Sequence, residues 1–194
     1  MTIVSALVTI PAPAPVVGER HLIARAQTGD AGAFRALVEA HQGRAYALAL
    51  RVLRCGADAE EVTQDAFVKA WAALPTFRGD SSFATWLHRI VWRRSLDRVA
   101  ELRARRRREE AVALDAPFSV EAGETDESHE DFAARLLGSL TPQQRAAVTL
   151  FYFEDRSVTQ AARVMSCPES TFKTHLHRAR AALRAAWQLE RSGQ

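Results

Sequence analysis

The sequence predicts an all-α protein made of two small helical domains joined by a flexible acidic linker. Apolar residues recur at helical spacing from Glu19 onward, and no strand-rich stretch or internal repeat interrupts them. Residues 109–131 carry nine acids with no Lys or Arg, and they are poor in large apolar side chains. The chain then closes on two short helices, of which the second is basic. At 194 residues it is long enough to build two small cores.

Residues 1–18 are predicted to form a flexible N-terminal extension, because alternating Ala and Pro resist both helix and sheet. The apolar run at the start is too short to span a bilayer, and it lacks the basic segment of a signal peptide. We therefore expect no membrane insertion.

Residues 19–106 are predicted to form the first domain. One or two helices occupy 20–55 and end at Gly56, and another opens at Asp58 with acids in its first turn, as the helix dipole favours. Pro75 and the following loop close that helix, and Phe83 begins a helix that turns from apolar to basic. The likeliest core residues of 20–55 are Leu22, Ala26, Phe34, Leu37, Val38, Tyr46, Leu48 and Leu50.

The second domain is placed at 132–190, after a linker at 107–131. Its last helix has one apolar stripe, and a second set of side chains lies outside that stripe. Ser166-Cys167-Pro168 separates it from a short preceding helix, because proline suits the first turn of a new helix. The stripe consists of Phe172, Leu176, Ala179, Leu183 and Ala186, and outside it lie Lys173, Thr174, His177, Arg178 and Arg184. This hairpin fits a DNA major groove, although the pattern alone equally fits a surface helical hairpin.

Charge is distributed unevenly along the chain. Residues 93–108 hold eight arginines against two acids, for a net charge of +6, and residues 132–194 sum to +5. The acidic block between them sums to −9. Two basic blocks around an acidic one suggest two contacts with a polyanion. The 24 arginines against two lysines could instead reflect genomic base composition.

Nothing in the sequence indicates an enzyme, a metal site or a cofactor. A phosphate-binding glycine loop, a nucleophile elbow and a zinc-binding H-E-x-x-H are all missing from the printed sequence. Two cysteines lie far apart and suggest free thiols in a reducing compartment. Cys167, His175 and His177 come nearest to a metal cluster, but histidines two apart on a helix point about 200° apart.

Four segments together resemble an extracytoplasmic function (ECF, group IV) sigma factor of the sigma-70 family. The resemblance spans about 20–187 and rests on DAEEVTQDAFVKAW (58–71), FRGDSSFATWLHRI (77–90), LTPQQRAAVTLFYFED (140–155) and ESTFKTHLHRARAALR (169–184). It implies a cytoplasmic protein that binds bacterial core RNA polymerase, reads the −35 and −10 promoter elements and helps DNA melting. It also implies an anti-sigma factor as partner. An ordinary helix-turn-helix regulator is the alternative, but that reading explains only 140–187.

The resemblance assigns polymerase binding to the helix over 58–71. Its polar contacts would be Asp58, Glu60, Glu61, Gln64 and Asp65, while Phe67 and Trp71 would supply apolar area. For Trp71 we favour a place in the core, and for Glu61 and Gln64 we favour the partner.

The −10 element is assigned to the segment from Phe77 to Arg98. Melting requires a flipped base, which aromatics and arginines hold by stacking. The candidates are Arg78, Gly79, Asp80, Ser81, Ser82, Phe83, Thr85, Trp86 and Arg93, with Trp92 as a further aromatic. The loop 78–82 and Thr85 suit the base best, and Trp86 suits the core. Many family members carry Asn where this chain has Arg93, so the −10 preference does not transfer.

The −35 element is assigned to the helix that starts at Glu169. Its first residues should reach base edges in the major groove, where Lys and Arg favour guanine. The base candidates are Lys173, Thr174, His177 and Arg178, and the phosphate candidates are Arg163, Thr171 and Arg180. Arg180 and Arg184 could instead be solvated surface. Arg145 matches a family arginine that could be structural.

Overall fold

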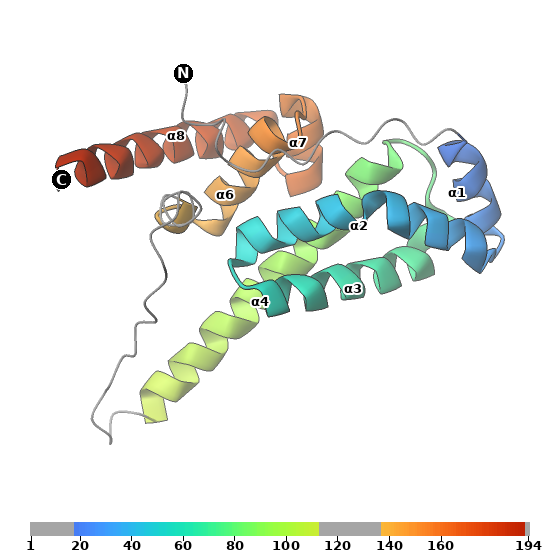
Figure 1. Cartoon of the computed structure of the whole chain (residues 1–194), viewed down its shortest axis with the longest axis horizontal. Coiled ribbons are helices and arrows are strands. Elements are labelled where there is room, and N and C mark those ends of the chain that lie inside the picture. Colours follow the sequence, from blue (N-terminus) through green and yellow to red (C-terminus); the bar gives the residue numbers. More distant parts are fainter. Residues whose placement is uncertain (1–17, 113–136, 193–194) are drawn as a thin grey trace.

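The structure, a computed structural model, describes residues 18–112 and 137–192. Every regular element in these two ranges is helical (Figure 1). The N-terminal half (18–112) contains α1 (Glu19–Gln27), α2 (Ala31–Leu53), α3 (Gly56–Ala73), the 3₁₀ turn η2 (Leu74–Thr76) and α4 (Phe83–Val112). The C-terminal half (137–192) contains α6 (Pro142–Val148), the π-helical turn η4 (Thr149–Phe153), α7 (Val158–Met165) and α8 (Glu169–Ser192). The all-α prediction is confirmed for the described residues. The expected extension and most of the expected linker lie outside them.

Local sequence sets where the first helices begin and end. The Asp30 side chain accepts a hydrogen bond from the Ala33 amide, which satisfies a free donor at the start of α2. Arg54 ends α2 in the left-handed conformation, with φ 61°. α3 then begins at Gly56, two residues earlier than the sequence predicts. The predicted core residues of α1 and α2 all join the hydrophobic cluster.

Helix α4 corrects the predicted boundary between the first domain and the linker. The helix continues through residue 106 to Val112, so Glu109 and Glu110 are helical. Arg, Glu and Ala are strong helix formers, and this run contains no Gly or Pro to stop it. The acidic character of 109–112 therefore did not end the helix.

The helix-turn-helix of the C-terminal half forms as predicted. Ser157 caps α7 in a reciprocal capping box with Gln160. Ser166 ends α7 in the left-handed conformation, with φ 53°, and Pro168 stands just before α8. On α8 the predicted stripe faces inward, with Phe172 fully buried.

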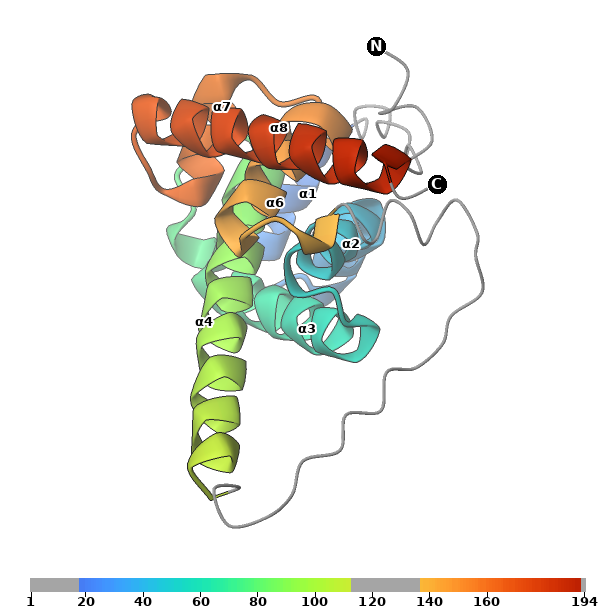
Figure 2. The same cartoon turned by 90° about the vertical axis from the view of Figure 1, so that its left-hand side faces the viewer.

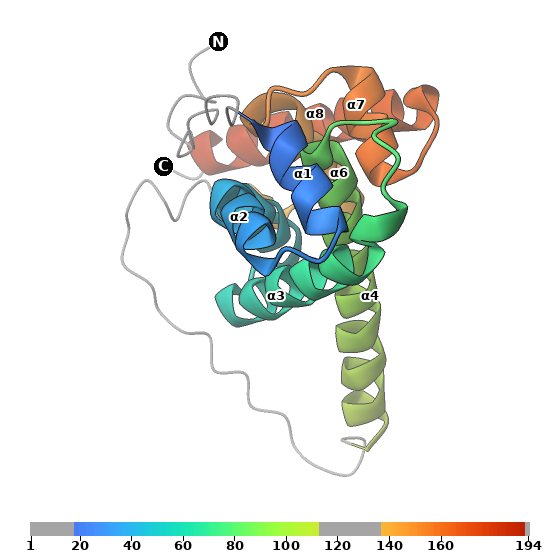
Figure 3. The same cartoon turned by 90° about the vertical axis from the view of Figure 1, so that its right-hand side faces the viewer.

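The two halves pack against each other, although the sequence predicts separate domains. Buried side chains from both halves form one continuous hydrophobic cluster. Figures 1, 2 and 3 place α6, α7 and α8 together on one side of the molecule, against α2 and the first part of α4. The last part of α4 extends away from the rest of the molecule (Figure 2). The interface therefore covers only the first part of that helix.

Candidate nucleic-acid interface

The outer face of α8 presents the predicted −35 residues to solvent. The apolar stripe fixes the rotation of this helix, so side chains between the stripe positions point outward. All seven candidates on α7 and α8 are exposed: Arg163, Thr171, Lys173, Thr174, His177, Arg178 and Arg180. The structure thus brings these residues to one accessible surface of the helix-turn-helix.

Arg180 differs from its neighbours because the protein already holds its side chain. Its Nε donates a hydrogen bond of 2.7 Å to the Tyr152 hydroxyl. The guanidinium carbon also lies 5.5 Å from the centre of the Tyr152 ring and 5.8 Å from that of Phe151. These contacts restrain the Arg180 side chain and leave it exposed, which suits its predicted contact with a phosphate of the DNA backbone.

The exposed face of α3 carries the predicted polymerase-binding residues. Arg98 on α4 donates to Asp58 Oδ1 and lies 2.9 Å from Glu61 Oε2. The hydrogen bond from Arg98 holds the pKa of Asp58 below its usual range. Arg94 pairs likewise with Asp65, at 2.5 Å. The Asp58 carboxylate is therefore ionised, and ion pairs with Arg94 and Arg98 hold all three carboxylates in place.

Two other residues of this face, Glu60 and Gln64, are exposed. Phe67 is different: it is only 8% exposed and packs edge-on against Phe34. Its expected role as apolar contact area is therefore corrected, because Phe67 belongs to the core. Trp71, expected in the core, stacks on Phe34 at 4.8 Å but remains 36% exposed.

The predicted −10 residues divide into two groups. Arg78, Gly79, Asp80 and Ser82 are exposed and Ser81 is half-buried, so the loop 78–82 is accessible. Gln27 fixes the start of this loop, because its amide donates to the carbonyls of Leu74 and Phe77. Arg93 is also exposed, on α4.

Three further candidates are not accessible in this arrangement. Phe83 is 1% exposed and lies among Phe77, Trp86 and His41. Trp86 is half-buried in the same aromatic cluster, as expected. Phe83 therefore belongs to the core in this arrangement, and its predicted stacking on a base stays a prediction.

Thr85 is buried because the C-terminal half covers it. Arg156, between η4 and α7, donates 2.8 Å to Thr85 Oγ1 and 2.9 Å to Nδ1 of His88. Thr85 is 5% exposed and His88 is fully buried. Burial, reinforced by the nearby Arg156 charge, holds the pKa of His88 well below its usual range. The imidazole is neutral and accepts the hydrogen bond from Arg156.

A second set of contacts continues along α4. The Trp92 indole donates 3.3 Å to the Met165 carbonyl, and Arg89 donates to the Arg163 carbonyl and to Ser166 Oγ. Trp92 is 3% exposed, so it is an interface residue here and not an available aromatic. Hydrogen bonds thus hold the end of α7 against the part of α4 that carries the predicted −10 residues.

Arg145 and Glu154 hold the other end of the interface. Arg145 donates to the carbonyls of Val52 and Leu140, each at 2.7 Å. Glu154 is buried and lies 3.8 Å from Arg44, and burial raises its pKa. Arg145 is therefore structural, as the sequence analysis allows.

Sequence reasoning missed the interface residues Arg89, Arg156 and Glu154. An arginine or glutamate in a helical segment reads as solvated surface, and nothing local marks a partner that lies 68 to 77 residues away for the two arginines and further still for Glu154. The only sequence signal was the resemblance of Arg145 to a family arginine.

Within the described ranges, no three His, Cys, Asp or Glu side chains lie close enough together to hold a metal ion. Nor does any described helix have the length and apolar character that a bilayer crossing requires.

Comparison with known proteins supports the same division of the chain. The family described as Sigma-70 region 2 matches residues 37–108, and Sigma-70, region 4 matches residues 133–183. The RNA polymerase sigma-H factor of Pseudomonas aeruginosa is 33% identical over 88% of this chain and 94% of its own length. The ECF RNA polymerase sigma-E factor of Escherichia coli K12 is 33% identical over 84% of this chain and 90% of its own.

Solved structures agree in fold. CnrH, in complex with the cytosolic domain of CnrY, aligns with a TM-score of 0.63 at 30% identity, over 89% of this chain and 98% of its own. The sigma factor RpoE of Bartonella quintana, in complex with the anti-sigma factor NepR, aligns with a TM-score of 0.64 at 22% identity, over 80% of this chain and 96% of its own. With its region 2 and region 4 segments and its full-length relatives, the chain belongs to the ECF sigma factors of the sigma-70 family.

Proposed function

We propose that this sigma factor is a group IV member that acts in the cytoplasm and directs promoter-specific initiation by core RNA polymerase. The main support for this proposal is the exposed face of α8, to which we assign recognition of the −35 element. Lys173, Thr174, His177 and Arg178 lie near the start of the helix, where side chains reach base edges in a major groove. Thr171, Arg163 and Arg180 flank them as phosphate contacts.

Polymerase binding is assigned to the outer face of α3. Arg94 and Arg98 hold Asp65, Asp58 and Glu61 in place, so the carboxylates form a fixed acidic surface. A fixed surface loses little conformational entropy on binding, which favours affinity. Glu60 and Gln64 complete this face.

Reading of the −10 element is assigned to the loop 78–82, with Thr85 joining when the two halves separate. The loop is accessible in the packed arrangement, whereas Arg156 covers Thr85. We therefore expect the complete −10 surface only after α7 leaves α4. Arg93 lies outside the covered face and would approach the DNA in either arrangement.

An anti-sigma factor is proposed as a further partner. Support comes from the structural relatives, since CnrH was solved with the cytosolic domain of CnrY and the Bartonella protein with NepR. The family relation also supports a non-enzymatic role, and we propose that the chain has no catalytic activity of its own.

The decisive experiment is run-off transcription with bacterial core polymerase on a promoter library. A sigma factor should co-purify with core enzyme and select templates with both a −35 and a −10 preference. A helix-turn-helix regulator would bind duplex DNA alone and support no initiation, and that result would reject the proposal.

A further inference from the structure

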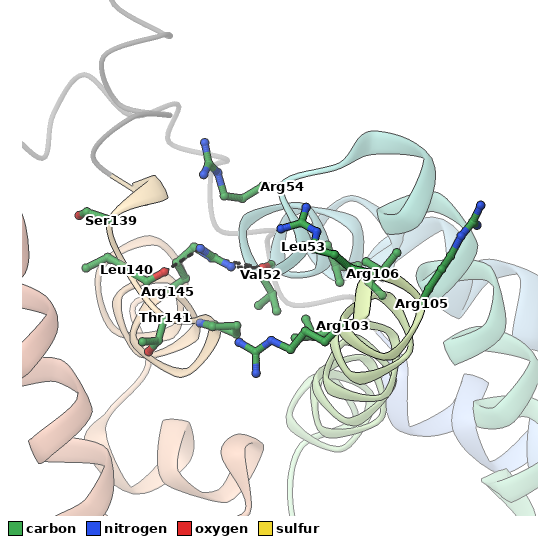
Figure 4. Close-up of a pocket in the computed structure, with 13 residues that line it drawn as sticks. Val52, Leu53, Arg54, Arg103, Arg105, Arg106, Ser139, Leu140, Thr141 and Arg145 are labelled. Atoms are coloured by element: carbon green, nitrogen blue, oxygen red, sulfur yellow. Dashed lines mark hydrogen bonds between the residues drawn. The ribbon is translucent and has the colours of Figure 1, made fainter. Parts of the chain in front are cut away.

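A groove lies where the two halves of the molecule meet, outside the residues assigned above to the −35 element, the −10 element and the polymerase. Its walls are the C-terminal end of α2, the region of α4 around Arg103, and the turn before α6 (Figure 4). The cavity volume is about 750 Å³, which lies in the range of small-molecule sites, ~300–1,000 Å³.

The groove is strongly basic. Five arginines line it: Arg54, Arg103, Arg105, Arg106 and Arg145. None of the described residues that line it is an Asp or Glu. Burial lowers the pKa of Arg145, and the charges of Arg54 and Arg103 lower it further. The charges of Arg54, Arg103 and Arg145 thus repel one another, and a bound anion would relieve this repulsion.

The protein fixes one of these arginines before any ligand arrives and leaves space for a second. Hydrogen bonds to the Val52 and Leu140 carbonyls hold Arg145. Arg54 lies across Gly138, where an added Cβ would come within 2.7 Å of its Nη1. The absence of a side chain at Gly138 is therefore what allows Arg54 to lie beside the groove.

The other walls supply the remaining charges. Val99, Leu102, Arg103 and Arg106 share one face of α4, because residues three and four apart are neighbours on a helix. Figure 4 shows Arg103 pointing from α4 toward helix α6, which carries Arg145, while Arg105 points away at the rim. The arginines that line the groove besides Arg105 are Arg54, Arg103, Arg106 and Arg145, and the charges of Arg54 and Arg103 act on Arg145.

We propose that this groove binds an oligophosphate group, carried either by a nucleotide or by inorganic polyphosphate. Several guanidinium groups around one space match a chain of phosphates, because Arg54, Arg103 and Arg106 can donate hydrogen bonds to phosphate oxygens. Arg145 adds its charge, since carbonyls already accept from its N–H groups. No described lining residue is aromatic, so the groove offers no platform for stacking a base. Recognition therefore rests on the phosphates.

Binding here would also fasten the two halves together. Arg54 and Arg103 come from the N-terminal half, whereas Arg145 comes from the C-terminal half. A ligand that contacts all three binds only the packed arrangement and stabilises it by mass action.

The test is isothermal titration calorimetry, in which sodium tripolyphosphate is titrated into the full-length chain without polymerase at near-physiological salt. We expect saturable 1:1 binding that weakens about tenfold in Arg103→Ala and in Arg54→Ala, from the loss of charged hydrogen bonds. Arg107→Ala is the matched control: it makes the same charge change, one turn along α4, at an exposed residue that does not line the groove. Gly138→Ala should weaken binding as well, because it displaces Arg54.

Further arms separate the possible ligands. ATP binding as tightly as tripolyphosphate, or more weakly, supports a phosphate site, whereas a large preference for ATP would overturn recognition by phosphates alone. Equal losses in Arg103→Ala and Arg107→Ala would mean diffuse attraction to the basic helix and would reject the groove. A variant with Glu121, Glu124, Asp126 and Glu127 changed to Gln or Asn tests the chain's own acidic segment. If tripolyphosphate binds only that variant, the natural occupant is that segment and the proposal fails.

Discussion

The guanidinium of Arg156 donates a 2.9 Å hydrogen bond to Nδ1 of His88, joining the turn before α7 to the first part of α4. Both side chains are buried, and the same guanidinium covers Thr85. This bond requires a neutral imidazole, so protonation of His88 would remove an acceptor and place two positive charges together.

Stability should therefore depend on pH through His88. Its pKa is depressed in the folded protein, so its contribution is fully present above about pH 6.5 and declines as the pH falls below that value. Arg156 faces it from the turn before α7, and His41 and Arg44 face it from α2. Urea unfolding from about pH 8 to about pH 5 should show this loss.

The matched variant is His88→Asn, whose amide oxygen can accept from Arg156 but does not titrate. It should have a flatter pH dependence than wild type over the same range. An identical slope in the two proteins would assign the effect to other groups, His41 among them.

Arg145 should contribute strongly to stability. Arg145→Met removes the donors to the Val52 and Leu140 carbonyls, and unsatisfied buried groups cost about 1–3 kcal/mol. We expect a loss in the free energy of unfolding of that order, measured by urea titration. Arg184→Ala, on the exposed face of α8, should change it by less than about 0.5 kcal/mol. Equal effects of the two changes would contradict a structural role for Arg145.

The exposed face of α3 should control polymerase affinity. Gln64→Ala combined with Glu61→Gln removes one neutral and one charged group from this face. Neither residue belongs to the core. Binding to core polymerase should weaken, while the melting temperature changes little, since exposed substitutions usually cost under about 0.5 kcal/mol. Wild-type affinity in a fluorescence titration with core enzyme would reject this surface.

The start of α8 should determine promoter choice. Arg178 lies where side chains reach base edges, whereas Arg184 lies further along the helix. Arg178→Ala should change the ranking of −35 sequences, with a loss of about 1–3 kcal/mol at the preferred base. Arg184→Ala should leave the ranking unchanged. If both variants keep the wild-type ranking, α8 is a backbone clamp and not a reader of bases.

The packed halves also predict the outcome of limited proteolysis. We expect early cleavage between Val112 and Leu137, where the acidic segment joins the two halves. Because buried hydrogen bonds and one hydrophobic cluster span the interface, the fragments should elute together in gel filtration. Separate elution would show that the covalent link is needed to hold the halves together.

The sequence predicted helices and the accessible face of α8 well, because both depend on local periodicity. The Phe172 stripe fixes how α8 sits, and the outward residues follow from it. The burial of Thr85, Phe83 and Phe67 was not predicted, because a motif match does not reveal burial. Arg156 covers Thr85, His41 packs on Phe83 and Phe34 packs on Phe67, and each partner is distant in sequence. Docking between the halves rests on such long-range pairs, so periodicity could not predict it.

Helix α4 is continuous over 30 residues, from Phe83 to Val112. At 1.5 Å per residue it is a rod about 45 Å long. Thr85 and His88 lie near one end, and Arg103 and Arg106 lie toward the other. A rod of this kind transmits a tilt imposed at one end to the other as a larger displacement. Departure of α7 from α4 and the position of the arginines around Arg103 are therefore mechanically coupled, without any need for a bend in the helix.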